Sequence, residues 1–417
     1  MPQPKRPGHP SVTFVMFDAW GGGGVARTTA NLANHLARTR QVRVISLYRW
    51  RRRARFELDP AVELVTLRDP TQRLPRWARV LDDWPSRLRP DPPERNMSLL
   101  TDLLLRRAIR AVPPGSVLIS TRPSLHLACT AYVRRGVTTV GWEHMNFSSR
   151  MKSPRMRAVL EAAIPALDGY VVLTEADASD YRRELPLGNA EVAVIRNSVS
   201  WPILDEVPPR DSKVIVSAGR LVPHKGVKRL VRAFAPIASS HPDWQLHIYG
   251  DGNQKQEIKD LVARLGLETQ VRVQGYAHDL HPVLAGASVF AMTSEKEGFP
   301  MVLIEAMSNG VPLIAFDCPR GPGEIIRHGR NGLLIPEGPT RRFRQALLSL
   351  VEDAELRERL GAQALRDAHA YAIENIAADW ERLFARLGVA GAEGVASAPP
   401  RGRFARGGLL RDTPGTR

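Results

Sequence analysis

The sequence predicts an α/β protein made of two Rossmann-like halves. Three observations predict this fold class: short buried strand patterns alternate with amphipathic helix patterns, the alternation lapses near residues 199–212, and a glycine-containing turn follows the first strand of each half. At 417 residues the chain is also too long for one ordinary core, so two domains of roughly 150–200 residues are expected.

The first half opens with an apolar strand over residues 11–17, a glycine turn and a helix over 25–37, as a mononucleotide-binding βαβ unit does. A strand over 42–47 follows, and the regular pattern then degrades from Arg49 to about Pro93. Further strands are expected at 116–120, 137–142, 169–174 and 192–195, with helices at about 98–112, 124–135 and 153–166 and another ending near 184.

Prolines at 202, 208 and 209 lie among charged residues and indicate an interdomain linker. The second half then predicts strands at 213–218, 244–249, 271–274, 288–292, 312–316 and 332–335. Helices are expected at about 226–239, 253–265, 278–285, 300–309, 323–328, 340–351 and 354–388, the last broken near 370–373. The tail over 391–417 is of low complexity and is expected to be disordered.

Composition favours a globular protein of the cytoplasm. Hydrophobic residues make up 43% and charged residues 24% of the chain, no apolar run is long enough to span a membrane, and no apolar signal core is seen. Two cysteines, Cys129 and Cys318, argue against a disulfide framework. The net charge of +16 is concentrated in residues 1–200, where 31 Lys and Arg stand against 18 Asp and Glu. Such a surface could meet nucleic acid, an anionic substrate or an anionic membrane, or it could simply be solvated.

The most informative stretch places two carboxylates, Glu297 and Glu305, around a Gly298-Phe299-Pro300 turn. Pro300 fits the first turn of a helix, which puts Glu297 in the preceding loop and Glu305 about one and a half turns inside. Helix N-termini hold phosphates well because their first N–H groups are unpaired. The pattern therefore suits a ligand with a phosphate between hydroxyl groups, such as a nucleotide sugar.

A second motif, Gly219 to Gly226, ends a strand and opens a helix, and it carries Arg220 and Lys225. Both side chains are expected to project from the carboxyl edge of the sheet toward the same cleft. A guanidinium and an ammonium together can bind a diphosphate and stabilise the charge of a departing nucleoside diphosphate. Two solvated charges in a loop are the alternative.

Three other sites remain open between a functional and a structural role. His144 follows a strand at the edge where open α/β sheets bind ligands, although it could merely be packed there. Tyr276 could flank a base or belong to the core. Arginines interleaved with Trp50, Trp77 and Trp84 could lie in a membrane interface, or their stems could cover apolar surface.

The glycines from Gly21 to Gly24 formally match the dinucleotide fingerprint, but no carboxylate follows the second strand to hold a ribose. Arginines at that point leave an NADP-dependent oxidoreductase open as an alternative. A basic nucleic-acid-binding protein is another, although no nucleic-acid-binding motif is present and the best-defined site is acidic. No metal-ligand spacing is seen.

Together these motifs resemble a retaining glycosyltransferase of family 4 with the GT-B fold. The resemblance is strong over about 213–385 and looser over 11–198. It is carried by Gly219-Arg220 with Lys225-Gly226, by Ile248 to Gly252, by the Glu297 and Glu305 element, and by Gly329 to Ile335, with Gly21–Gly24, Trp142 to His144 and Ile195 to Asn197 as weaker features.

The resemblance implies that Glu297 contacts hydroxyls of the donor sugar, that Glu305 holds the ribose, and that Arg220 and Lys225 bind the diphosphate, assisted by backbone N–H groups around Gly298–Pro300. His144 would lie near the transferred sugar. Gly21–Gly24, of which Gly23 and Gly24 are the site residues, would bring backbone close to the donor phosphate and the acceptor. No metal or other cofactor would be needed. The implied organisation is an acceptor-side domain over 1–200, a nucleotide-sugar domain over 201–375 and a helix over 376–390 that crosses back.

The resemblance also points to family members that build bacterial surface polymers. The implied reaction moves a hexose from a nucleotide-diphosphate sugar, expected to be a UDP-sugar, to an anionic or lipid-linked glycan or polymer. The basic first half suits such an acceptor and a peripheral contact with the anionic inner membrane, and no nucleic-acid partner is expected.

Overall fold

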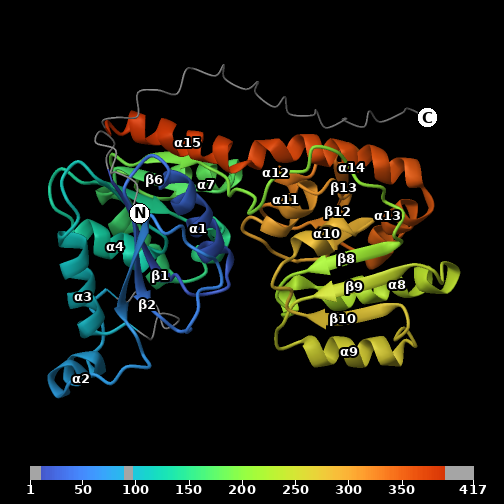
Figure 1. Ribbon diagram of the computed structural model, residues 1–417, viewed down its shortest axis with the longest axis horizontal. Helices are drawn as coiled ribbons and strands as arrows, with labels where there is room; N and C mark the ends of the chain where they lie inside the picture. The colour runs from blue at the N-terminus through green and yellow to red at the C-terminus, as the bar shows by residue number, and fades with distance from the viewer. Residues whose placement is uncertain (1–10, 89–96, 390–417) are drawn as a thin grey trace, which may run out of the picture.

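The computed structural model describes residues 11–88 and 97–389, which form two α/β halves joined along one side (Figure 1). In these residues the N-terminal sheet has the spatial order β3 (Val62–Arg68), β2 (Val42–Tyr48), β1 (Val12–Asp18), β4 (Val117–Ser120), β5 (Thr138–Trp142), β6 (Gly169–Val172) and β7 (Glu191–Val194). The C-terminal sheet has the order β10 (Val271–Gly275), β9 (Gln245–Tyr249), β8 (Val214–Ala218), β11 (Val289–Met292), β12 (Leu313–Asp317) and β13 (Gly332–Pro336). The predicted pair of Rossmann-like sheets is confirmed.

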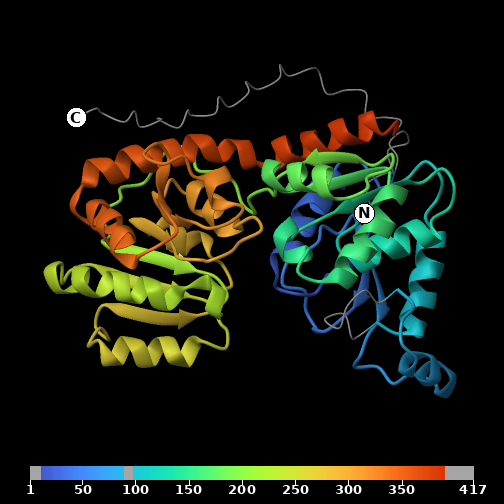
Figure 2. The ribbon, with the colours of Figure 1, turned by 180° about the vertical axis from the view of Figure 1, so that it is seen from behind.

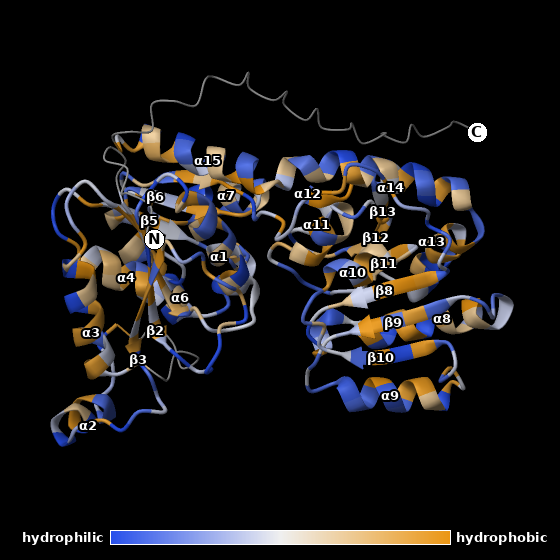
Figure 3. Ribbon diagram, viewed as in Figure 1, coloured by the Kyte–Doolittle hydropathy of each residue, from blue (hydrophilic) through white to orange (hydrophobic). Residues whose placement is uncertain are grey.

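Helices cover both sheets. The N-terminal half contains α1 (Gly24–Leu36), α2 (Arg76–Asp83), α3 (Leu99–Arg110), α4 (Pro123–Tyr132), α5 (Phe147–Arg150), α6 (Pro154–Ala163) and α7 (Glu175–Glu184). The C-terminal half contains α8 (Val227–Ser240), α9 (Lys255–Arg264), α10 (His281–Ala285), α11 (Met301–Met307), α12 (Pro322–Ile325), α13 (Thr340–Glu352) and α14 (Ala354–Ala368), and α15 (Ile373–Arg386) follows. The helices carry mixed hydrophilic and hydrophobic residues, whereas the strands are mostly hydrophobic (Figure 3), as expected for sheets covered on both faces.

The last helix crosses back to the first half, as expected. A 3₁₀ turn at His369–Tyr371 separates α14 from α15, and α15 then lies along the N-terminal half in both views (Figures 1 and 2). The Trp380 ring packs edge-on against Trp142 at 5.0 Å, and Arg40 Nε donates to Glu381 Oε1 at 2.9 Å. The buried core near α15 therefore includes side chains from both halves.

The poorly patterned stretch from Arg49 to Pro93 contains two elements that the sequence did not indicate, β3 and α2. The strand β3 pairs in parallel with β2 at the edge of the sheet, and only its first residue, Val62, is fully buried. An edge strand tolerates charged residues such as Glu63 and Arg68, so it does not read as a continuous apolar run. The tail over 391–417, expected to be disordered, lies outside the described residues.

The strand order fixes where a ligand can bind. All registered strand pairs are parallel. In each sheet the direction in which successive strands are added reverses at the same place, between β1 and β4 in one half and between β8 and β11 in the other. In open parallel sheets such switch points open a crevice at the carboxyl ends of the strands. The loops after β1 and β8 begin at these two crevices.

Candidate active site

A cavity of about 330 Å³ lies between the two halves, at the loops after β1 and β8. It collects most of the residues singled out from the sequence: Gly23, Gly24, Arg220, Lys225, Tyr276, Glu297, Phe299, Pro300 and Glu305. Two predicted residues, His144 and Gly298, are not in its lining. The four charged groups of the two sequence motifs thus share one cavity, while their roles toward a ligand remain predictions.

Close backbone contact brings the loops of the C-terminal half together. Gly250, after β9, has a φ of 145°, and a Cβ atom there would lie 1.8 Å from the carbonyl oxygen of Gly219, after β8. Only glycine allows this approach. The turn that carries Arg220 is therefore held against the neighbouring strand end, with Arg220 exposed at the cavity wall.

Lys225 and Glu297 form an ion pair inside the cavity. Lys225 Nζ lies 2.6 Å from Glu297 Oε1, and the side chain of Glu297 is only 9% exposed. A largely buried charge is stable only when it is paired, and here each side chain is the ion-pair partner of the other. The pair presents a cation for a phosphate and a carboxylate for hydroxyl groups at adjacent points.

Glu305 is buried and forms an ion pair with Arg27, which belongs to α1 of the other half. Burial raises the pKa of Glu305, and the Arg27 guanidinium partly offsets that rise. Arg27 also lies 4.8 Å from the Phe56 ring.

The expected position of Pro300 is slightly wrong. Pro300 caps the helix and α11 begins at Met301, which leaves Glu305 a little over one turn inside the helix.

The loop that carries His144 touches the Glu297 turn from the opposite half. Asn146 Nδ2 donates to the carbonyl oxygen of Glu297 at 2.5 Å, and a Cβ atom on Gly298 would lie 3.0 Å from the carbonyl oxygen of His144. Gly298 is thus engaged in a contact between the halves. The loop is shaped by buried Glu143, which accepts from the backbone N–H groups of His144 and Met145 at 2.9 Å each.

Burial alone would raise the pKa of Glu143, but Arg150 outweighs that effect and holds the pKa below its ordinary value. Arg150 donates two hydrogen bonds to the carboxylate, at 2.7 and 2.8 Å. Burial lowers the pKa of His144 to about 3, against the opposite effect of Glu143. His144 is therefore a neutral imidazole near pH 7, and its Nε2 atom has no hydrogen-bond partner among the described residues.

Several side chains in or next to this cavity were not singled out from the sequence, among them Arg27, Arg55 and Asn146. The Arg55 guanidinium lies 4.5 Å from the Tyr276 ring, and its Nη1 atom is 3.2 Å from His278 Nδ1. Tyr276 is therefore a cleft residue. A cation one turn after the glycine loop was a usable signal for Arg27, whereas Arg55 was hidden among many arginines.

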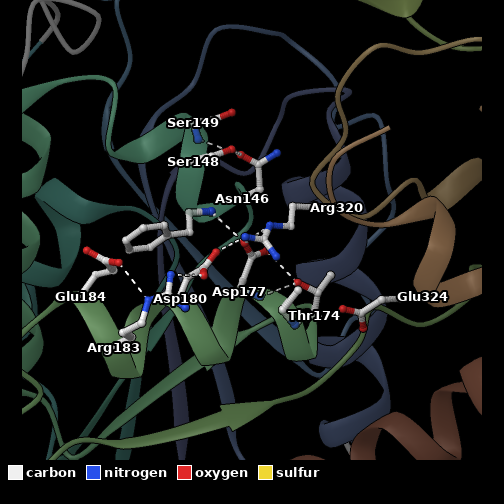
Figure 4. A network of polar contacts seen from close by, with 12 residues as sticks. Asn146, Ser148, Ser149, Thr174, Asp177, Asp180, Arg183, Glu184, Arg320 and Glu324 are labelled. Atoms are coloured by element: carbon white, nitrogen blue, oxygen red, sulfur yellow. Dashed lines mark hydrogen bonds and ion pairs between the residues drawn. The ribbon is translucent and has the colours of Figure 1, made fainter. Parts of the chain in front are cut away.

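A larger cavity of about 960 Å³ also lies between the halves, but charged groups of its lining pair with one another. Arg320, from the C-terminal half, forms an ion pair with Asp180 and lies 3.4 Å from Asp177 (Figure 4). Glu324 accepts from the first backbone N–H groups of α7, those of Glu175 and Ala176, at 3.2 Å. These contacts connect the two halves, and we call them the interdomain clasp.

Within residues 11–88 and 97–389, no cluster of three or more His, Cys, Asp or Glu side chains is arranged to hold a metal ion. The same residues include no helix that is both long and apolar enough to cross a bilayer.

Comparison with known proteins gives matches to both halves. The family model Glycosyltransferase Family 4 matches residues 22–200, and Glycosyl transferases group 1 matches residues 204–367. An exopolysaccharide phosphotransferase of Streptomyces coelicolor is 33% identical over 90% of this chain, which spans only 41% of that protein. A poly(ribitol-phosphate) alpha-N-acetylglucosaminyltransferase of Staphylococcus aureus is 27% identical over 58% of this chain and 48% of its own length.

Solved structures share the fold at low identity. S. aureus TarM, in a complex that contains UDP, has a TM-score of 0.71 at 16% identity, with 89% of this chain and 99% of that chain covered. The pneumococcal O-GlcNAc transferase GtfA, in complex with UDP and GlcNAc, has a TM-score of 0.71 at 14% identity, with 91% and 99% covered. Consecutive family models cover both halves, and solved structures share the arrangement of the two sheets. The chain therefore belongs to the glycosyltransferases of the family 4 type with the GT-B fold.

Proposed function

We propose that this protein transfers a hexose, with retention of anomeric configuration, from a UDP-sugar to a cell-surface polymer or lipid-linked acceptor. The observation that carries the proposal is the shared cavity, in which Arg220, Lys225, Glu297 and Glu305 converge between the two halves. Cations suit the diphosphate and carboxylates suit hydroxyl groups at both of its ends. The relatives support the same class of reaction, since one is named for transfer to poly(ribitol-phosphate).

In the proposed reaction, the bond between the anomeric carbon and the β-phosphate oxygen breaks through an oxocarbenium-like transition state. Arg220 and Lys225 stabilise the negative charge that grows on the departing diphosphate, together with backbone N–H groups around Gly298–Pro300. Glu297 binds donor-sugar hydroxyls, Glu305 binds the ribose, and Tyr276 flanks the base. The acceptor hydroxyl attacks on the face from which the phosphate leaves, and its proton passes to the leaving phosphate.

The neutral state of His144 fits a hydrogen bond with a hydroxyl of the transferred sugar. Its Nε2 atom is buried without a partner among the described residues, a costly arrangement unless a ligand or water completes it. Gly23 and Gly24 place backbone, without side chains, at the cavity wall near the position proposed for the donor phosphate. No metal or other cofactor takes part in the proposed reaction.

A thermal-shift panel tests the donor class directly, with UDP, GDP, UDP-sugars, GDP-sugars and NADPH added to the same protein. A rise in melting temperature with UDP and UDP-sugars alone supports the proposal, because a ligand that binds only the folded state stabilises it. A rise with NADPH alone would favour the oxidoreductase alternative. With an active donor and acceptor pair, NMR of the first product distinguishes retention from inversion.

A further inference from the structure

The helix α2 displays an aromatic stripe to solvent. Trp77, Val80 and Trp84 are 66%, 55% and 58% exposed. Trp77 and Val80, spaced i and i+3, lie on one face of α2. Trp84 follows directly as the extended residue that caps the helix, so the stripe consists of two helical side chains and the residue at which the helix ends. Large exposed apolar side chains that gather in one place mark an interaction surface more often than isolated ones do.

The opposite face of α2 is fixed to the protein. Ala78 is buried, the Ser98 hydroxyl donates to Asp82 Oδ1 at 2.7 Å, and Arg68 Nη2 lies 3.3 Å from Asp82 Oδ2. The carbonyl oxygen of Trp84 accepts from the backbone N–H of Leu99 at 2.9 Å. The stripe is thus held outward by its own helix, at the end of the N-terminal half remote from α15 (Figures 1 and 2).

Exposed cationic residues lie on α2 and next to it in the chain. Between residues 71 and 88 the exposed charged residues are four arginines and one carboxylate, namely Arg73, Arg76, Arg79, Arg87 and Asp83. The second carboxylate of that stretch, Asp82, faces Arg68 and Ser98 instead. The stripe therefore lies in a locally positive surface.

We propose that α2 docks on the headgroup region of an anionic lipid bilayer, with Trp77 and Trp84 at the boundary between headgroups and acyl chains. Tryptophan is favoured at that boundary because its ring is apolar and its N–H can meet polar groups. Arginines close to an anionic bilayer are attracted to its negative surface potential. Aromatic insertion and a basic patch together supply the two signals that stable peripheral binding needs.

The size of the stripe disfavours a second copy of the chain as the occupant. A stable protein interface buries about 800 Å² per partner. A fully buried tryptophan contributes roughly 150–250 Å², so two partly buried tryptophans and one valine fall well short. Four arginines in so small a patch would also repel the same patch on a symmetric partner.

Docking would hold the cleft near an acceptor linked to lipid, and this role of α2 rests on the proposed function. The residues of α2 take no part in the donor cavity. Docking and donor binding can therefore be measured separately on the same full chain.

Vesicle flotation at low and high salt tests the proposal. The full chain should float with vesicles that contain phosphatidylglycerol, float much less with pure phosphatidylcholine, and be released as salt rises. Replacing both tryptophans (Trp77→Ser with Trp84→Ser) should weaken binding by about tenfold or more, since both apolar rings are lost from the interface. Arg76→Gln with Arg79→Gln should weaken binding to anionic vesicles and flatten the salt dependence.

Matched controls lie on the C-terminal half. Leu265→Ser removes an exposed apolar side chain, and Arg341→Gln with Arg342→Gln removes the same charge from α13. Both controls should float like the unmodified chain. The proposal is overturned if the unmodified chain does not float, if the controls lose as much binding as the α2 variants, or if the tryptophan variants alter only self-association in sedimentation.

The thermal shift caused by UDP should be unchanged in every α2 variant. Flotation without any response to nucleotides would leave the docking site in place and refute the proposed donor. A thermal shift with UDP in a chain that does not float would support the proposed donor and refute the docking site.

Discussion

The loops after β1 and β8 occupy the same topological position in two sheets whose order agrees over six strands, yet they contribute different chemistry. The loop after β8 carries its own cations, Arg220 and Lys225, whereas the glycines after β1 offer only backbone, and the cation Arg27 comes from the helix that follows. The C-terminal half therefore concentrates its chemistry in short motifs. The N-terminal half assembles its contribution from residues far apart in the chain.

This difference predicts that the largest loss of activity comes from the β8 loop. We expect Arg220→Ala and Lys225→Ala each to lower the rate of sugar transfer by about 10²–10³-fold, because charge on the leaving diphosphate is no longer stabilised. Steady-state kinetics with saturating donor measures the effect. Arg232→Ala and Lys259→Ala remove exposed cations of the same half and should keep full activity. Full activity in both loop variants would refute the diphosphate assignment.

The N-terminal half should instead respond most strongly to acid. His126 is completely buried beside Ser120, with 2.7 Å between Nδ1 and the hydroxyl oxygen, and burial lowers its pKa to about 4, against the influence of Glu143. Between pH 6.5 and 4 the unfolded chain binds the proton more readily. The free energy of unfolding should therefore fall by about 2–3 kcal/mol from this group as the pH drops through that window.

Urea unfolding at a series of pH values measures this slope. His126→Asn keeps a polar partner for Ser120 and should flatten the slope, whatever its effect on stability at pH 7. The exposed His369→Asn should leave the slope unchanged. Equal slopes in all three proteins would show that His126 does not resist protonation in the folded state.

A smaller effect is expected at Glu305, where the halves meet and where we propose that the ribose binds. Glu305→Gln should raise the KM for the nucleotide sugar by about tenfold with little change in kcat, since a charged hydrogen-bond acceptor is worth about 1.5–3 kcal/mol. The nearby exposed Glu295→Gln is the matched control. An unchanged KM in the Glu305 variant would argue against a ribose contact.

The smallest effect should come from the interdomain clasp. Arg320 and Arg183 both form an ion pair with Asp180, but Arg320 reaches it from the other half, while Arg183 belongs to the same helix. Arg320→Ala should loosen the halves by less than about 1 kcal/mol, because the pair is partly exposed. Small-angle scattering of the ligand-free protein should show a slightly larger radius of gyration for Arg320→Ala. The radius of gyration of Arg183→Ala should be unchanged. If Arg320→Ala and Arg183→Ala gave the same radius of gyration, the ion pair of Arg320 with Asp180 would not help to hold the two halves together.

Much of the fold was predictable because strand and helix periodicities are local. The elements around Arg220, Lys225, Glu297 and Glu305 were expected within a few residues of their observed bounds. The same reasoning missed β3, since an edge strand lacks a continuous apolar run, and α2, whose outward face is aromatic and cationic. A local hydrophobic pattern is clear only where an element is well buried. Neither β3 nor α2 is buried on both sides, so neither has such a pattern.

The amino-acid order by itself determined the alternation of strands and helices, the glycine turns, and which charges follow a strand end. Parallel strands bring their carboxyl ends to one edge, so those charges had to meet. Tertiary structure alone decided which partner each charge takes: Glu305 pairs with Arg27, 278 positions away, and Asn146 reaches the backbone of Glu297. Such pairings depend on how the two halves are oriented, and that orientation is set by packing around α15 and by the clasp.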